Sequence, residues 1–197
     1  MYRGRPEALD RVRGRRVAIW IGGGIACYKL ASTVSTLAQA GCEVHVAMTP
    51  AATRFVAPLT FEALAGRPVH TSVWEQVDRA DPQHIKLATS IDLCLVAPCT
   101  YDLLGKLVHG LADDPVSLLV ASIDRRRIPV LLAPSMNETM WLQPANQRNL
   151  QTAAQDGYRI LAPGDGWQAC RAVGPGRLPE PDDLVEAIAD ALGPRTA

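Results

Sequence analysis

The chain has 197 residues, 48% of them apolar, and its 20 Lys and Arg residues balance its 20 Asp and Glu residues. This length suits one domain with a full hydrophobic core, and the balanced charge argues against nucleic-acid partners, whose phosphates need an excess of cations. The five cysteines form no C-x-x-C pair, which argues against a disulfide framework and a metal site, and no apolar run approaches the roughly 20 residues of a membrane span.

The first 15 residues are rich in arginine, with cations at Arg3, Arg5, Arg11, Arg13 and Arg15. Charged chain ends of this kind are usually solvated. We therefore predict a basic N-terminal arm over residues 1–15 and a single domain over residues 16–197. We also expect a cytoplasmic location with no membrane partner, since no signal-type apolar segment follows the arginines.

Residues 16–21 form an apolar run that predicts a buried strand, followed by three glycines and a helical pattern over residues 25–40. A glycine turn before a helix can bind phosphate through unpaired N–H groups. Tight packing between strand and helix explains the glycines about as well. A second strand over residues 43–48 ends at Thr49, whose hydroxyl would either add a donor to the same phosphate or cap a helix.

The next segments are short helices over residues 51–56 and 58–65, a polar connection, and a helical piece that begins near His84. A strand over residues 91–97 leads to the segment Pro98–Asp102, which is followed by helices over residues 103–111 and 116–123. On pattern alone, His84 has many structural uses.

The apolar run over residues 128–132 predicts another buried strand, and it leads to the segment Ala133–Trp141. The amide of Asn137 suits a planar or carboxylate-bearing ligand, whereas an ordinary reading makes Asn137 a helix cap. Further along we predict a helix to about residue 157, a strand over residues 158–162 and a terminal helix over residues 182–192. Between the last two, the Gly- and Pro-rich stretch 163–181 reads as a long loop, a feature that is often functional.

Strands that alternate with helices predict an α/β fold: a mainly parallel sheet between two helical layers. The glycine turn, Thr49, the Pro98 loop and Asn137 all follow strands. They should therefore gather at one edge of the sheet, where ligands of such folds bind.

Four stretches resemble motifs of the flavin-dependent cysteine decarboxylases. Residues 134–141, Pro-Ser-Met-Asn-Glu-Thr-Met-Trp, are similar to the motif P-x-M-N-x-x-M-W, which is the most specific of the set. Residues 98–103 resemble P-A-S-A-N-T in its variant form P-A-T-A-D-L. Residues 23–29 resemble the first-loop pattern, and residues 166–181 resemble the substrate clamp.

This resemblance implies a flavodoxin-like, Rossmann-like fold that binds FMN between the subunits of a homotrimer, with four trimers often forming a dodecamer. It implies that His84 binds or deprotonates the substrate thiol, that Asn137 orients the carboxylate and that Cys170 acts as an acid on the clamp (residues 163–181). The residues implied to bind FMN are Gly23, Gly24, Ile25, Thr49, Pro98, Thr100 and Met136. The residues implied to contact the substrate are Asn137, Met140 and Arg177.

Within this family, the retained Cys170 favours decarboxylation of the cysteine moiety of 4′-phosphopantothenoylcysteine, which gives 4′-phosphopantetheine for coenzyme A. An oxidative decarboxylase of peptides ending in cysteine is the alternative. A flavoprotein that only binds a partner is a third reading, of another class. Two departures from the pattern are Gly22, where the family has Ser, and Arg171-Ala172, where it has Gly-Asp.

Overall fold

The computed structural model describes residues 2–74, 83–167, 171 and 173–194. Its centre is a parallel sheet with the strand order β2-β1-β3-β4-β5. Strand β2 is added on one side of β1, and β3, β4 and β5 follow on the other side, so the order of addition reverses between β1 and β3. The strands are β1 (Arg16–Ile21), β2 (Glu43–Met48), β3 (Leu93–Cys99), β4 (Val130–Pro134) and β5 (Arg159–Ile160). This is the strand order of flavodoxin-like folds, and it confirms the predicted architecture.

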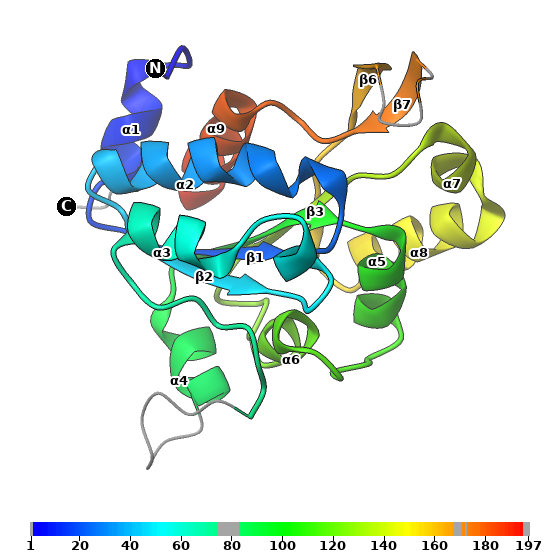
Figure 1. Cartoon of the computed structure of the whole chain (residues 1–197), viewed down its shortest axis with the longest axis horizontal. Coiled ribbons are helices and arrows are strands. Elements are labelled where there is room, and N and C mark those ends of the chain that lie inside the picture. The colour runs from blue at the N-terminus through cyan, green and yellow to red at the C-terminus, as the bar shows by residue number, and fades with distance from the viewer. Residues whose placement is uncertain (1, 75–82, 168–170, 172, 195–197) are drawn as a thin grey trace.

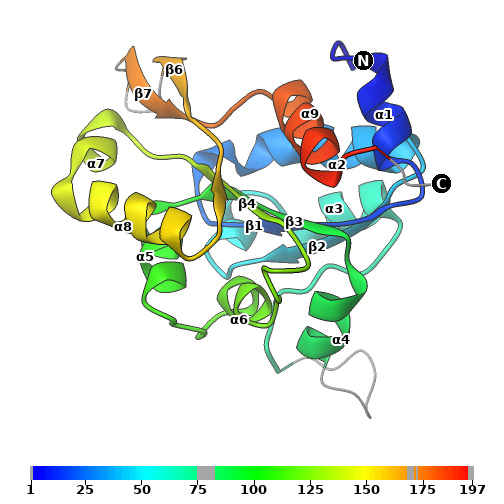
Figure 2. The same ribbon diagram turned by 180° about the vertical axis from the view of Figure 1, so that it is seen from behind.

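Helices cover both faces of the sheet (Figures 1 and 2). One face carries α1 (Pro6–Val12), α2 (Lys29–Gln39), α3 (Pro58–Ala65) and α9 (Pro181–Leu192). The other carries α4 (Gln83–Ser90), α5 (Tyr101–Val108), α6 (Pro115–Ala121) and α8 (Pro144–Gln155). The short helices η1 (Ile25–Tyr28), η2 (Ala52–Arg54) and α7 (Glu138–Leu142) follow β1, β2 and β4. In the described part of the chain, no helix is long and apolar enough to cross a membrane.

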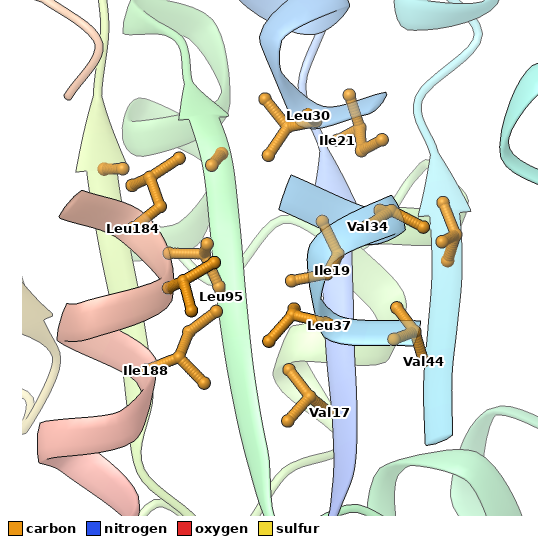
Figure 3. Close-up of a cluster of buried hydrophobic side chains, with 14 of the residues drawn as sticks. Val17, Ile19, Ile21, Leu30, Val34, Leu37, Val44, Leu95, Leu184 and Ile188 are labelled. Carbon is orange, nitrogen blue, oxygen red and sulfur yellow. The ribbon is translucent and has the colours of Figure 1, made fainter. Parts of the chain in front are cut away.

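Strand β1 shows why the sheet has a core on each face. Val17, Ile19 and Ile21 pack toward α2 and α9, whereas Ala18 and Trp20 belong to the opposite cluster. Side chains of a strand alternate between faces, so an apolar run without alternation requires a cover on both sides. Figure 3 shows Leu184 and Ile188 of α9, four residues apart on one helix face, above β3 and its neighbours.

The N-terminal segment is not the solvated arm that its arginines suggested. Residues 6–12 form α1, which packs along α9 and buries Ala8 and Val12 in the core. Arg5 pairs with Glu186 at 3.1 Å, and Arg11 pairs with Asp190 at 2.9 Å. Arg5 at the start of α1 and Arg11 within it therefore bind acids of α9, while the apolar side of α1 enters the core, an arrangement that a charge count alone does not reveal.

The stretch predicted as a long loop after residue 162 also differs. It contains an antiparallel hairpin of β6 (Gly164–Trp167) and β7 (Val173–Arg177). The hairpin stands apart from the central sheet, beside α7 (Figure 1). Glycine and proline are depleted in strands, so the composition of the segment argued against this element.

Candidate functional site

A pocket of about 640 Å³ opens at the carboxyl ends of β1, β3 and β4, where the strand order reverses. Its lining joins the loop after β1, the start of α5, the loop after β4 and the hairpin. Residues predicted to bind cofactor or substrate that meet here are Gly23, Gly24, Ile25, Thr100, Met136, Asn137, Met140 and Arg177. Sequence reasoning thus located the wall of the pocket.

The glycine loop forms one side of the pocket. A methyl group on Gly23 would lie 2.3 Å from the Cβ atom of Ala51, and one on Gly22 would lie 2.3 Å from the carbonyl oxygen of Pro98. Glycine is therefore required for the backbone to approach these neighbours. The N–H groups of Ile25 and Ala26, which open η1, have no acceptor among the described residues, so they are available to an anion in the pocket.

Thr100, the N-cap of α5, stands beside the glycine loop, since a methyl group on Gly24 would lie 3.5 Å from its Cγ2 atom. Its hydroxyl oxygen accepts the Leu103 N–H at 3.3 Å, so the hydroxyl hydrogen remains to donate to a ligand. Beneath it, the Cys99 carbonyl accepts the Ser135 N–H at 3.1 Å and joins the loops after β3 and β4. Burial raises the pKa of the Cys99 thiol to about 12, so this cysteine is an inert core residue.

The orientation of the Asn137 amide follows from its capping role. The side-chain oxygen accepts the Met140 N–H at 2.8 Å. A backbone N–H can only donate, so the atom that faces it must be the carbonyl oxygen, and the NH₂ group is left for the pocket. Capping and ligand binding, which the sequence posed as alternatives, are compatible: helix α7 holds the amide, and the amide offers two donors to a carboxylate.

Two cations and one carboxylate lie at the base of the hairpin. Lys29 is 8% exposed, and its Nζ donates to the Leu178 carbonyl at 3.3 Å and pairs with Glu180 at 3.0 Å. Arg177 pairs with the same carboxylate at 2.6 Å. Lys29 and Arg177 both line the pocket, so the local charge favours an anionic ligand.

The hairpin is joined to the Asn137 loop by direct contacts. The Met136 N–H donates to the Gly176 carbonyl at 3.0 Å. A methyl group on Gly174 would lie 2.9 Å from the carboxyl carbon of Glu138, so the first turn of α7 packs closely against β7. The loop that presents Asn137 and the hairpin that would cover a ligand therefore form one packed unit.

Three of the described residues that were predicted for the site do not line this pocket. Pro98 lies behind the glycine loop, with its ring near Gly24, and Thr49 is buried with its hydroxyl oxygen accepting the Ala52 N–H at 3.1 Å. His84 lies on α4, which contacts α6 and is at the opposite end of the molecule from α7 (Figures 1 and 2). Cys170 lies outside the described residues.

Sequence reasoning missed Lys29 and Trp167, which both line the pocket. A signal for Lys29 was present: a lysine within the apolar pattern of a helix requires an acidic partner when it is buried, and the partner is the half-exposed Glu180. Trp167 is 63% exposed beside the pocket and offers a flat apolar surface. A phosphate at the glycine loop and a planar ring near Trp167 and the methionines would both be accommodated.

Comparison with known proteins finds a family model and curated relatives that match most of the chain. The family model described as Flavoprotein matches residues 7–193. The coenzyme A biosynthesis bifunctional protein CoaBC of Bacillus subtilis is 42% identical over 175 residues, which cover 89% of this chain and 42% of that protein. CoaBC of Mycolicibacterium smegmatis is 43% identical over 87% of this chain and 40% of its own length. The chain thus spans less than half the length of these relatives.

Solved structures share the fold at lower identity. The FMN-dependent cysteine decarboxylase SpaF superposes with a TM-score of 0.77 and 28% identity, covering 92% of this chain and 97% of its own. A cysteine-to-serine mutant of PPC decarboxylase, solved with pantothenoylaminoethenethiol, gives a TM-score of 0.77 and 25% identity over 89% of this chain and 97% of its own.

Proposed function

Since this chain belongs to the Flavoprotein family, we propose that it is an FMN-dependent enzyme that decarboxylates the cysteine moiety of 4′-phosphopantothenoylcysteine to give 4′-phosphopantetheine. The observation that carries the proposal is the Asn137 amide, whose NH₂ group is left for the pocket beside the glycine loop. The CoaBC relatives at about 40% identity and the PPC decarboxylase structure favour this substrate. A cytoplasmic location stays a prediction.

The pocket fits FMN by its chemistry. Its volume lies in the range of cofactor sites. The close packing at Gly23 leaves backbone N–H groups accessible to a phosphate, and Thr100 can add a hydroxyl donor. When bound, FMN would supply the oxidising power that turns the carbon bearing sulfur into an electron sink for the departing carboxylate.

The chain's own residues then have distinct tasks. Asn137 donates to the substrate carboxylate and holds it until carbon dioxide leaves, and it does so without burying a counter-charge. His84 binds the substrate thiol or accepts its proton. Cys170 returns a proton to the product. The net reaction exchanges carbon dioxide for a proton at one carbon, so it consumes no external oxidant or reductant.

Substrate and product masses test this proposal. The FMN-loaded protein is incubated with phosphopantothenoylcysteine, and with a peptide that ends in cysteine. We expect the first compound to lose one carbon dioxide. Loss of carbon dioxide plus two hydrogens from the peptide, with phosphopantothenoylcysteine unchanged, would identify a peptide decarboxylase. FMN binding without turnover of either compound would favour a flavoprotein that only binds a partner.

We further propose that the active unit is a homotrimer, alone or as four trimers in a dodecamer, in which His84 serves the pocket of a neighbouring subunit. Helix α4 lies at the far end of its own chain from the Asn137 loop (Figure 2). Ile85, next to His84, is 46% exposed, and Ile25 and Tyr28 at the pocket are 57% and 61% exposed. Exposed apolar residues at both places suit a subunit contact.

Mixed oligomers test the assignment. His84→Asn and Asn137→Asp variants are each expected to be inactive. If a site takes His84 from one subunit and Asn137 from another, random equal mixing restores about a quarter of the sites. If both residues come from one chain, mixing restores none. Each pure variant, carried through the same unfolding and reassembly, is the control.

A further inference from the structure

A second pocket lies at the opposite edge of the sheet, where the strands begin. It has a volume of about 580 Å³ and is lined by the starts of β1 and β5, the ends of α4 and α9, and the loop between α6 and β4. Four of its residues are arginines: Arg15, Arg16, Arg127 and Arg159. Two are acids, Asp92 and Asp124, so the lining carries an excess of positive charge.

Both acids already have cationic partners. Asp92 accepts the Arg16 backbone N–H at 2.7 Å and lies 3.7 Å from the Arg16 guanidinium. Asp124 accepts from the backbone and side chain of Arg126, which does not line the pocket, at 3.1 Å each. Each acid thus has an arginine as its hydrogen-bonding partner, and Asp124 also attracts Arg127. With four arginines and two acids, the lining keeps an excess of positive charge.

Arg15, Arg127 and Arg159 have no side-chain acceptor in the described part of the chain. The Nε atom of Arg15 is buried with no hydrogen-bond partner. Because this atom is shielded from the open pocket, a ligand there would meet Arg15 through its terminal NH₂ groups. Arginines elsewhere in the fold can reach helix carbonyls: Arg125 donates to the Asp156 carbonyl at the end of α8 at 3.0 Å. The pocket arginines make no such bond, so helix capping does not explain them.

Apart from Thr89 and Ser122, the uncharged residues of the lining are apolar. Ile91, Ile128, Pro129 and Leu192 provide a surface that a small inorganic anion would not need. Ligand pockets usually combine such a surface with a few charged groups, and this volume lies in their usual range. Guanidinium groups bind phosphate oxygens in pairs, and several arginines around one cavity suit more than one phosphate oxygen.

We propose that this pocket binds an organic phosphate of about nucleotide size, with the phosphate against Arg15, Arg127 and Arg159 and the organic body against the apolar wall. The site is separate from the glycine-loop pocket, because the two open at opposite ends of the strands.

Calorimetric titration of the protein loaded with one equivalent of FMN and freed of unbound flavin tests the proposal. The flavin then occupies the glycine-loop pocket, and no free FMN, itself an organic phosphate, competes for the second pocket. The probes are ADP, adenosine and pyrophosphate, at concentrations up to about 5 mM. We expect saturable binding of ADP, weaker binding of pyrophosphate and none of adenosine. Flavin fluorescence should stay constant during the titration. A change would mean that ADP displaces FMN from the glycine-loop pocket, which would refute the assignment.

Paired variants distinguish specific ADP binding in this pocket from nonspecific attraction to a positively charged surface. The double variant Arg127→Glu/Arg159→Glu should weaken ADP binding at least about tenfold, because each lost contact is a charged hydrogen bond. Arg148→Glu changes an exposed arginine on α8 that lies outside the pocket and pairs with neither pocket acid, and it should leave ADP affinity nearly unchanged. No saturable ADP binding, or an equal loss in both variants, would overturn the proposal. The milder double variant Arg127→Gln/Arg159→Gln should also bind ADP more weakly. An unchanged circular dichroism spectrum would show that this loss does not come from misfolding.

Discussion

Replacement of Asn137 by Asp separates the two tasks of this side chain. The Asn137 oxygen caps α7 by accepting the Met140 N–H, and the NH₂ group is the donor left for the pocket. Asp keeps the capping oxygen, and Asp and Asn are about equally good caps. It also replaces the NH₂ donor by a negatively charged oxygen. We therefore expect an intact fold with a site that repels the substrate carboxylate.

The magnitudes follow from these changes. Loss of a hydrogen bond to a charged group costs about 1.5–3 kcal/mol. Two like charges about 4 Å apart add roughly 4 kcal/mol at the effective dielectric of a protein surface. Together they should lower kcat/KM by about 10⁴- to 10⁵-fold. The free energy of unfolding should change by less than about 0.5 kcal/mol, since the cap remains.

Asn137→Ala is the matched control, because it should lower stability more than Asn137→Asp does and activity less. Alanine loses the cap, at a cost of about 1 kcal/mol in stability, or a fall of roughly 2–4 °C in Tm. It loses the donor without adding a charge, so kcat/KM should fall only about 10- to 100-fold. Asp should thus be the more stable variant and the less active one.

The assays are carbon dioxide release, flavin absorbance and thermal unfolding. The activity of the Asp variant, relative to that of the original protein, should rise as the pH falls, because protonation removes the added charge. An Asp variant that is more active than the Ala variant at neutral pH would refute the repulsion argument. Loss of flavin from the Asp variant would mean that Asn137 contacts the cofactor rather than the substrate.

Three further predictions concern the loops and the histidines. Gly23→Ala should lower FMN affinity and Tm, measured by flavin titration and thermal unfolding, because the new methyl group would meet the Cβ atom of Ala51 at 2.3 Å. Gly174→Ala should lower kcat/KM by about tenfold by displacing the hairpin from α7, whereas Gly164→Ala, whose methyl group has 3.9 Å of clearance in the same hairpin, should have little effect. Burial lowers the pKa of His70 below 6.5, so the unfolded chain binds the proton more readily and stability should fall as the pH drops below about 6.5; a flat denaturant midpoint between pH 7 and 5 would contradict this.

The parts of the fold that the sequence predicted well are those in which local pattern and burial agree. The first two strands have the predicted bounds, residues 16–21 and 43–48, because each is a short apolar run closed by glycine or proline. The strands predicted at 91–97 and 128–132 lie two residues further along, because Pro98 and Pro134 continue β3 and β4. Prolines were interpreted as ends, although in a strand they remove only one donor.

The parts that failed depend on partners distant in sequence. Helix α1 becomes stable by covering α9, about 175 residues further along the chain, and its arginines find their acids only there. The hairpin lacks strand propensity, and its contacts with the Asn137 loop supply what the propensity does not. Neither contact can be predicted from the local sequence of the element that it stabilises.

Lys29 shows how such a partner connects fold to function. Its buried ammonium group binds the Leu178 carbonyl and Glu180, and Glu180 in turn binds Arg177, so helix α2 holds the base of the hairpin. The Met136 N–H holds the same strand from the other side through the Gly176 carbonyl. Both supports begin at the carboxyl ends of strands of one sheet. The position of the hairpin over the pocket is therefore fixed by the sheet, and the glycines of β7 permit the close approach that this position requires.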